Sequence, residues 1–450
     1  MTRWLSSIWQ MPDLRSRVLF TLAMLAVFRL GIHIPAPGVD RLALAEWVKT
    51  GANSMFGLYD MFSGGALEQF SVFVLGVTPY ITASILVQIL TVVVPSLERL
   101  SKEGQQGRNQ ITQYTRYGTI AIALVQATLL ATTLETMKTG AGHDLVLNPG
   151  FEFQVITAIT MTAGSCFVMW LGEQISERGI GNGSSLIITA GILSQLPSGI
   201  RALYDKVSLN ELSLLQCAIL VVVMVIVIAL IVWIERAQVR IPIQHAKRVS
   251  GRRVYAGNNH LPLKINTTGV IPPIFASSVL ALPPTLAQIP ALAQYPAVQA
   301  FASQMSPGAW LYDYFYVVMI VFFSFFYTAL MFNPVDVADN LKKSQAYIPG
   351  IRPGKRTAEY IDKLLNKLTG AGALYLAAVC ILPTLLIAQW GIPFAFGGTS
   401  LLIVVGVSLD TVAQIEAQLL TRHYDGLQGP AGGVLKGRRQ MLIGAAGQAT

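Results

Sequence analysis

Charge is scarce in this chain. Of its 450 residues only 12% are charged, whereas 53% are hydrophobic, and the mean hydropathy is +0.54. A water-soluble protein cannot bury so large an apolar fraction in its core. The scarcity of charge therefore excludes a soluble enzyme or binding domain and predicts an integral membrane protein.

Cysteine is scarce as well. Cys166, Cys217 and Cys380 all lie inside apolar runs, where a thiol packs as a small apolar group. The spacing matches neither a disulfide framework nor a Cys/His metal site, so we expect no metal. The first apolar run ends in "GIHIPAPG" without a small-residue cleavage site, so we expect no cleavable signal peptide.

Motifs for nucleotide chemistry and metal-dependent hydrolysis are missing. "GIRPGKRT" has too few residues between its glycines for a phosphate loop, and Arg takes the place of the required Ser or Thr. "GIGNGSS" has the wrong glycine spacing for a dinucleotide fingerprint, and no HExxH occurs. We expect no enzyme activity, no catalytic residue and no cofactor, so nucleotide-driven work must come from a partner.

Long apolar runs are abundant. Each is about the length that a helix needs to cross about 30 Å of hydrocarbon with its backbone satisfied. The runs cover residues 18–34, 73–94, 117–133, 155–171, 180–196, 214–234, 270–289, 311–332, 371–388 and 394–412. The fifth is the weakest, because glycines and serines lower its hydropathy and helix propensity. The pattern predicts an all-α polytopic membrane protein with ten transmembrane helices.

Lys and Arg are divided unequally between the two sets of connecting segments. With a cytoplasmic N-terminus, Arg29 lies in the first span, and few of the 32 Lys and Arg fall outside: Arg41, Lys49, Lys138, Arg201 and Lys206. Cytoplasmic loops of membrane proteins carry the excess of Lys and Arg. Both termini are therefore predicted to be cytoplasmic, and the formal net charge of +9 is concentrated on one face.

Two of the basic loops, 238–268 and 333–370, are longer than ordinary connections, which indicates a binding role or disorder. Their clusters "KRVSGRRVY" and "PGIRPGKR" favour a partner rich in phosphate or carboxylate. The alternative is that these cations only set topology and contact anionic lipid.

Charge is absent from the centres of the spans. Arg29, Glu173, Asp313 and Asp410 lie toward span ends, and the uncharged polar residues Ser84, Gln88, Gln126, Ser277 and Ser278 are expected to hydrogen-bond between helices. An uncharged aliphatic path suits a large, varied cargo better than a selected ion. Two alternatives remain: a small-solute transporter, which needs a midplane binding site, and a structural scaffold, which conducts nothing.

Ten stretches, in this order, resemble the SecY/Sec61-alpha family of protein-translocation channels. They are "MFSGGAL", "PYITASI", "TQYTRYGT", "MWLGEQISERGIGNG", "GRRVYAG", "HLPLKIN", "GVIPPIFASS", "FFYTALMFNPVDVADNLKKS", "PGIRPGKRT" and "FGGTSLLIVV". The resemblance covers nearly the whole chain except residues 289–307 and the C-terminal tail. It implies a channel that passes unfolded secretory polypeptides across the membrane and releases membrane segments laterally into lipid.

The resemblance also implies the architecture. Two pseudo-symmetric, inverted halves of five helices surround a central pore. The N-terminal half covers residues 1–200 and includes a plug at about 56–72. The C-terminal half covers 201–415 with both long loops, and residues 416–450 form a cytoplasmic tail.

Matching positions in the family give the expected sites. The pore ring is Val77, Ile81, Ser184, Ile188, Ile274 and Ile403. The plug is Phe62, Ser63, Gly64, Gly65, Ala66 and Leu67. The lateral gate, between the second and seventh spans, is Ser84, Gln88, Gln126, Ile274, Ser277 and Ser278. The docking residues are Arg252, Arg253, Arg352, Lys355 and Arg356, with Arg352 the foremost.

Two of these sites carry specific expectations. Ser184 stands where the family usually has a bulky aliphatic residue, which predicts a weaker seal. Gly64 and Gly65 suit a movable plug helix, because glycine allows close packing and costs a helix about 1 kcal/mol.

The partners are likewise implied by the resemblance. They are the SecE and SecG subunits, the SecA motor ATPase, the ribosome through its RNA, signal sequences and unfolded preproteins, and membrane lipid, with SecDF and YidC as further candidates. The expected location is the bacterial cytoplasmic (inner) membrane.

Overall fold

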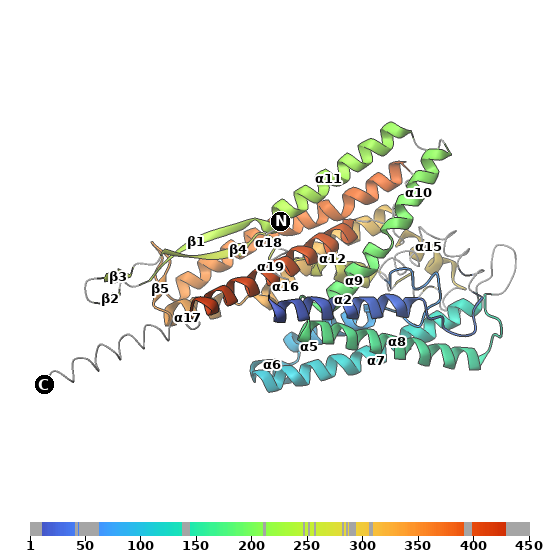
Figure 1. The fold of residues 1–450 in the computed structure, drawn as a ribbon, viewed down its shortest axis with the longest axis horizontal. Helices are drawn as coiled ribbons and strands as arrows, with labels where there is room; N and C mark the ends of the chain where they lie inside the picture. Colours follow the sequence, from blue (N-terminus) through green and yellow to red (C-terminus); the bar gives the residue numbers. More distant parts are fainter. Residues whose placement is uncertain are drawn as a thin grey trace, which may run out of the picture.

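The computed structural model describes most of the chain. The described residues are 11–40, 44, 63–136, 145–209, 213–245, 248–250, 253–255, 258–280, 283–284, 287, 294–305, 309–390 and 398–428. Long helices run side by side over most of the molecule (Figure 1).

Each of the ten apolar runs coincides with a helix. The N-terminal half contains α2 (Pro12–Ile32), α5 (Thr78–Val93), α6 (Pro95–Lys102), α7 (Gln105–Thr136), α8 (Phe151–Arg178), α9 (Gly183–Ser194) and α10 (Leu196–Ser208). The C-terminal half contains α11 (Leu214–Arg236), α12 (Ile271–Leu280), α15 (Pro296–Gln304), α16 (Trp310–Met331), α17 (Pro334–Lys343), α18 (Lys355–Trp390) and α19 (Gly398–Gln428).

Within the described residues, seven helices are long and apolar enough to cross a membrane, or eight if the bent pair α5 and α6 forms one span. The bend between α5 and α6 is 101°. It falls at Val94, which is extended because Pro95 disfavours helical backbone at the residue before it. The first run forms α2, which carries Asp13, Arg15, Arg17 and Arg29 within 21 residues. The fifth run forms the short helix α9 and continues into α10.

The described loops that the Lys and Arg distribution assigns to the cytoplasmic side lie toward one end of the bundle (Figure 1). We call this the sheet end, where α6, α17 and the strands lie. The other, where residues 63–71, α10 and α15 lie, we call the plug end. Consecutive spans therefore run in opposite directions between the two ends. This agrees with the unequal division of Lys and Arg between the two sets of connecting segments.

The long loops are not separate irregular connections. Strands β1 (Gln238–His245), β4 (Asn258–Lys264) and β5 (Ala346–Tyr347) form one antiparallel sheet in the order β4-β1-β5. Strands β2 (Arg248–Ser250) and β3 (Arg253–Tyr255) form a small hairpin between β1 and β4. The expectation of disorder in 238–268 and 333–370 is wrong for their described parts, because α17, β5 and the start of α18 fill most of the second loop.

A buried cluster explains why the sheet is ordered. Ile241 and Leu263 from the strands pack with Ile348, Ile361 and Leu365, the last two from α18. Because these side chains come from both loops, apolar burial holds the loops together as one body.

The largest hydrophobic cluster crosses the boundary between the two halves. It contains Ile32 of α2, Ile188 of α9, Phe275 of α12, Ile320 of α16 and Ile403 of α19. The halves are thus packed against each other by aliphatic and aromatic side chains at the level where the pore ring is expected.

Candidate functional site

The expected pore ring lies in this cluster. Val77, Ile188 and Ile403 are buried members of it, with at most 6% of each side chain exposed, and partly buried Ile81 and Ile274 pack against it. Helix α5 contacts α12, and α9 contacts α19, so both halves contribute. An apolar constriction of this kind excludes water and ions when it is closed.

The sixth ring position differs from the others. The hydroxyl of Ser184 donates to Oδ1 of Asn182 at 2.7 Å, and the same oxygen accepts the Ser185 amide at 3.3 Å. Asn182 is the N-cap of α9, a position where a side-chain oxygen satisfies free amides. Ser184 thus belongs to a polar helix start beside the apolar ring.

The described part of the plug begins at Ser63, and Phe62 and residues 56–61 lie outside the described residues. Ser63 is helical, and residues 64–70 form turns. Gly64 and Gly65 have φ angles of 75° and 86°, in the left-handed region that favours glycine. The sequence analysis expected these glycines to lower the stability of a plug helix. In the structure they instead form the turn that follows the helical residue Ser63.

The plug is packed tightly on α9. A Cβ atom on Gly64 would lie 2.8 Å from the Cα atom of Gly191, so no other residue fits there without movement. Ala66 is fully buried in the largest cluster, and Leu67 and Phe70 are buried in a second cluster of the N-terminal half. The segment thus bridges two parts of the hydrophobic core.

The last residues of the predicted plug segment are anchored to the end of α2. The Ala36 amide donates to the Phe70 carbonyl at 2.7 Å, and the Val72 amide donates to the Ile34 carbonyl at 3.0 Å. The buried hydroxyl of Ser71 donates to the Gly31 carbonyl at 3.2 Å. These bonds therefore hold residues 70–72 against the first helix, whatever role the preceding residues have.

Arg29 is a functional candidate that sequence reasoning missed. Its Nη1 donates to the Gly64 carbonyl at 2.8 Å and to the Ser194 hydroxyl at 3.1 Å. The sequence analysis assigned Arg29 to a span end, where a long side chain can reach water. The signal was available, since an arginine in an apolar span indicates a functional partner by default.

The polar residues of the expected lateral gate bond within their own helices. Nε2 of Gln88 donates to the Ser84 hydroxyl at 3.2 Å, and the hydroxyls of Ser277 and Ser278 donate to the Ile274 carbonyl at 2.9 and 2.8 Å. The expectation of bonds between helices is wrong for these four, because a carbonyl or side chain one turn away is the nearer partner. Helices α5 and α12 thus meet without a bond from these side chains.

Two amide oxygens near the gate are buried without a partner. Oε1 of Gln88 on α5 and Oε1 of Gln126 on α7 have no hydrogen bond in the described part of the chain. An unpaired buried oxygen costs free energy, which any donor arriving at the gate recovers.

The docking candidates of the second loop occupy a rigid turn. Arg352 is exposed, while its carbonyl accepts the Thr357 hydroxyl at 2.9 Å. Gly350 and Gly354 have φ angles of 83° and 104°, and Ile348 is only 4% exposed in the cluster beneath the sheet. The turn thus fixes the backbone and leaves the guanidinium free to meet a partner.

Lys355 and Arg356 begin α18, and both are exposed. The N-terminus of a helix carries a partial positive charge, so cations in the first turn destabilise it. Their presence is therefore better explained by an external anion than by the stability of α18.

One docking candidate of the first loop, Arg253, lies on the hairpin between β1 and β4. Arg253 is in β3, paired with Ser250 of β2, whereas Arg252 and the side chain of Arg253 lie outside the described residues. The pairing of β5 with β1 brings the two loops together, and the Tyr347 hydroxyl donates to Oε1 of Gln244, 103 residues away, at 3.2 Å.

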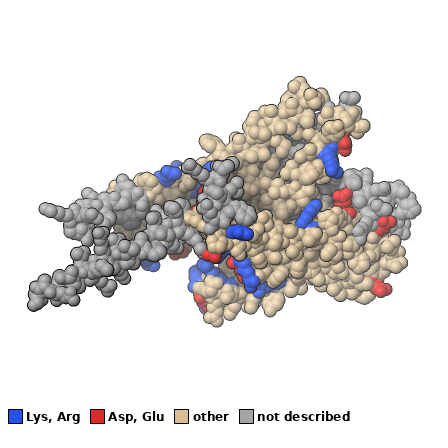
Figure 2. Space-filling view, in the orientation of Figure 1, with Lys and Arg blue, Asp and Glu red and all other residues tan. Residues whose placement is uncertain are grey.

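Most Lys and Arg side chains visible in Figure 2 lie on the left and centre of the molecule, toward the sheet end. On α6, Lys102 forms an ion pair with Glu98 at 2.7 Å. This bond lowers the pKa of the Glu98 carboxyl and raises the pKa of the Lys102 ammonium. Because both groups are exposed, this pair adds little stability.

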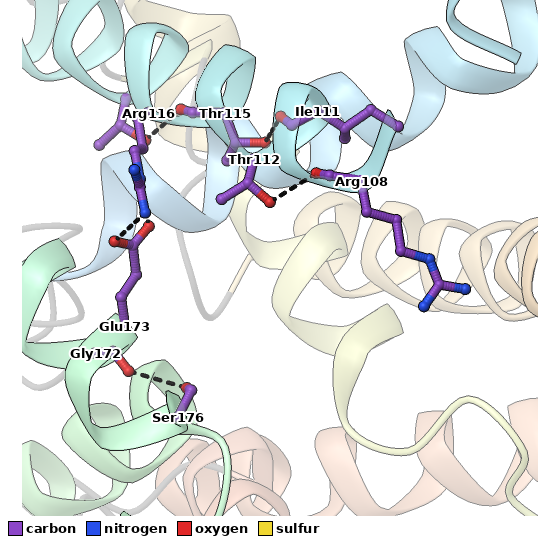
Figure 3. A network of polar contacts seen from close by, with 9 residues as sticks. Arg108, Ile111, Thr112, Thr115, Arg116, Gly172, Glu173 and Ser176 are labelled. Carbon is purple, nitrogen blue, oxygen red and sulfur yellow. Dashed lines mark hydrogen bonds and ion pairs between the residues drawn. The ribbon is translucent and has the colours of Figure 1, made fainter. Parts of the chain in front are cut away.

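A polar contact fixes α7 against α8 (Figure 3). Nε and Nη2 of Arg116 donate to the two carboxylate oxygens of Glu173, both at 2.9 Å. The hydroxyls of Thr112 and Thr115 bond to carbonyls one turn earlier on α7. Paired, planar Arg and carboxylate groups set the rotation of both helices, which gives the "TQYTRYGT" stretch a structural role.

The chain is similar to known proteins over most of its length. A family model described as SecY matches residues 71–412. The protein translocase subunit SecY of Escherichia coli (strain K12) is 46% identical over 415 residues, which cover 92% of this chain and 93% of that protein. That of Aquifex aeolicus (strain VF5) is 44% identical over 426 residues, covering 94% and 99%.

Solved structures share the fold. One described as a protein conducting channel has a TM-score of 0.63 at 17% identity, covering 90% of this chain and 92% of that chain. One that concerns the plug domain of a SecY protein has a TM-score of 0.64 at 20% identity, with the same coverage. One described as Sec61 in a canine ribosome-channel complex has a TM-score of 0.63 at 17% identity, again with that coverage.

Proposed function

The chain belongs to the SecY family and is a protein-conducting channel subunit of the Sec translocase, and from this premise we propose the path that its cargo takes. The predictions of a polytopic helical channel and of a subunit without enzyme activity are thereby confirmed. The alternatives of a small-solute transporter and a scaffold are set aside.

Polypeptides cross between the two halves, past Val77, Ile81, Ser184, Ile188, Ile274 and Ile403. The observation that supports this path is the apolar cluster at the contacts of α5 with α12 and of α9 with α19. Flexible aliphatic side chains can separate around a chain of any sequence, which suits unfolded secretory polypeptides as cargo.

Signal sequences and membrane segments leave sideways into lipid between α5 and α12, past Ser84, Gln88, Gln126, Ile274, Ser277 and Ser278. Two features support this gate. The bonds of its serines and of Gln88 stay within each helix, so separating α5 from α12 breaks none of them. The unpaired oxygens of Gln88 and Gln126 offer acceptors to an arriving segment.

The driving partner, the SecA motor ATPase or the ribosome, docks at the sheet end. Exposed Arg352, Lys355 and Arg356 support this surface. Arg253 of β3 is a further candidate, as is Arg252, which precedes it in the sequence. Ribosomal RNA is a dense phosphate surface, so binding should weaken as salt rises. Two of the similar structures are described as ribosome complexes, one of canine Sec61 and one of a yeast Ssh1 complex. SecE, SecG and, as accessory partners, SecDF and YidC complete the assembly.

The sheet end faces the cytoplasm, and the chain lies in the bacterial cytoplasmic membrane with both termini inside. The gathering of inside-assigned segments at one end supports this orientation. Residues 1–200, with the plug at about 56–72, and 201–415 form the two inverted halves, and 416–450 form the tail.

Reconstitution tests this proposal. The chain is placed in proteoliposomes with SecE and SecG, and SecA, ATP and a secretory precursor are added. The precursor should become protease-protected only when ATP is present. Cysteine probes at Ile81, Ile188 and Ile274 should cross-link to a stalled precursor. A probe at Val222 of α11, whose side chain is 56% exposed, should not. Equal cross-linking at all four positions would refute the path.

A further inference from the structure

Arg29 joins three segments that lie far apart in the sequence. It stands in the last turn of α2, where the helix dipole favours a cation. Its two side-chain bonds leave α2, however, and go to the Gly64 carbonyl at 2.8 Å and the Ser194 hydroxyl of α9 at 3.1 Å. The arginine therefore contributes more than a favourable charge at its own helix end.

Arg29 is the close donor to the Gly64 carbonyl. The Ser194 hydroxyl lies 3.4 Å from this carbonyl but donates its one proton to the nearer Gly191 carbonyl at 2.7 Å, which leaves its oxygen to accept from Arg29. Gly64 itself is buried and touches Gly191 so closely that a Cβ atom would lie 2.8 Å from the Gly191 Cα. A bond from a guanidinium to a carbonyl is charge-assisted, and it is stronger where water is excluded.

We propose that Arg29 is the positioning residue that latches the plug in the closed channel, through its bonds to the Gly64 carbonyl and to Ser194. This inference rests on the proposed function, because it needs the segment at 63–67 to act as a plug. Displacing the plug must break the bond to Gly64. The anchors at Phe70 and Val72 need not break, since they lie beyond the moving part.

The test uses the full chain with SecE and SecG in proteoliposomes, without precursor, and measures ion leak. Arg29→Gln should raise the leak about ten-fold, the factor that matches about 1.4 kcal/mol, because a hydrogen bond to a charged group is lost. Arg29→Lys should give an intermediate leak, since an ammonium keeps the positive charge but lacks the planar guanidinium that bonds both Gly64 and Ser194. Arg17→Gln removes the same charge from an exposed position on the same helix and should leave the leak unchanged.

A second readout locates the leak. Gly65→Cys is introduced into a chain whose three cysteines are replaced, because nothing lies within 4 Å of a Cβ atom at Gly65. A membrane-impermeant maleimide added from outside should label this cysteine faster when Arg29→Gln is also present. An arginine that only supports the fold would change assembly but not this rate in assembled complexes.

The outcomes separate the latch from the channel. An assembled, transport-competent Arg29→Gln complex with normal leak or normal labelling overturns the latch. Failure of the unsubstituted complex to transport a precursor overturns the proposed function instead. If Arg29→Gln does not assemble, Arg29→Leu replaces it in both assays, because an apolar residue favours insertion of the first span.

Discussion

The plug end and the sheet end use polar groups in opposite ways. At the plug end, Arg29 and Ser71 bond to the backbone carbonyls of Gly64 and Gly31, and Gly64 packs directly on Gly191. At the sheet end, Arg352 and its neighbours are exposed on a turn whose backbone is already satisfied. On the proposed function, the comparison teaches that closure depends on internal contacts and small volumes, whereas docking depends on charges kept available for a partner. Substitutions of charge and of volume should therefore act at different ends.

Charge reversal at the sheet end should have the largest effect. Arg352→Glu is expected to abolish SecA-driven translocation while the protein remains inserted and folded, because only the Arg352 carbonyl takes part in the turn. The measurement is ATP-dependent protease protection of a precursor. Lys342→Glu, at an exposed position on α17, is the matched control and should retain most of the activity. Normal translocation by Arg352→Glu would contradict the docking assignment.

Removal of the proposed plug should impair closure at the plug end and leave docking at the sheet end intact. Deleting residues 57–67 is expected to raise ion leak strongly without abolishing export, since the anchors at Phe70 and Val72 remain. Planar-bilayer conductance and precursor transport are measured on the same preparation. A tight channel after the deletion, or a loss of export, would show that this segment is not a plug.

A volume change at one glycine sharpens the comparison. Gly64→Ala should raise the leak more than Gly65→Ala, although both substitutions place alanine in the left-handed region. Only Gly64→Ala meets Gly191, and such overpacking typically costs about 1–3 kcal/mol more. Leak and thermal stability in detergent are compared for the pair. Equal behaviour would mean that backbone conformation alone explains these glycines.

The smallest effect is expected at Ser184. Ser184→Ile should lower the resting ion leak, because an aliphatic side chain extends the apolar ring over a polar helix start. Ser184→Thr keeps the hydroxyl and should leave the leak near its original value. An unchanged leak in Ser184→Ile proteoliposomes would separate this position from the seal.

Hydropathy was sufficient to locate the helices but not their ends. The runs at 371–388 and 394–412 became α18 and α19, which extend well beyond the apolar part. Hydropathy identifies only the stretch that suits lipid, and a helix continues into water as long as its backbone bonds do. Pro95 is a local signal for the bend at Val94, but hydropathy alone does not include it.

The sheet was missed for a different reason. β1 and β4 have the alternating pattern of strands, in "QVRIPIQH" and "NNHLPLK", yet they lie in segments that charge had marked as loops. β5 is only two residues long, and its partner lies about a hundred positions away, so no local pattern predicts it. The pairing depends on the tertiary burial of Ile348.

The site residues were predicted unevenly. Pore-ring side chains could be assigned by resemblance, and their role stays a prediction. All of them except Ser184 lie in or against one apolar cluster. The sequence could mark Arg29 as a candidate but could not identify its partner, which is the carbonyl of Gly64. A backbone acceptor has no side-chain signature, so a sequence gives the donor without the bond. The hydrogen-bond partners of Ser277 and Ser278 were wrongly predicted for the same reason, since both hydroxyls donate to the backbone carbonyl of Ile274.

The three-stranded sheet also has a mechanical meaning. Because β5 is paired with β1, the turn that carries Arg352 and the strands β1 and β4 form a single handle. This handle continues into α11 through β1 and into α12 through β4, and Nδ2 of Asn266 donates to Oε1 of Glu235 at 2.7 Å, tying these two exits together. If the sheet end is the docking surface, as proposed, a force applied there by a partner is delivered to both α11 and α12, and α12 is one of the two helices of the proposed gate.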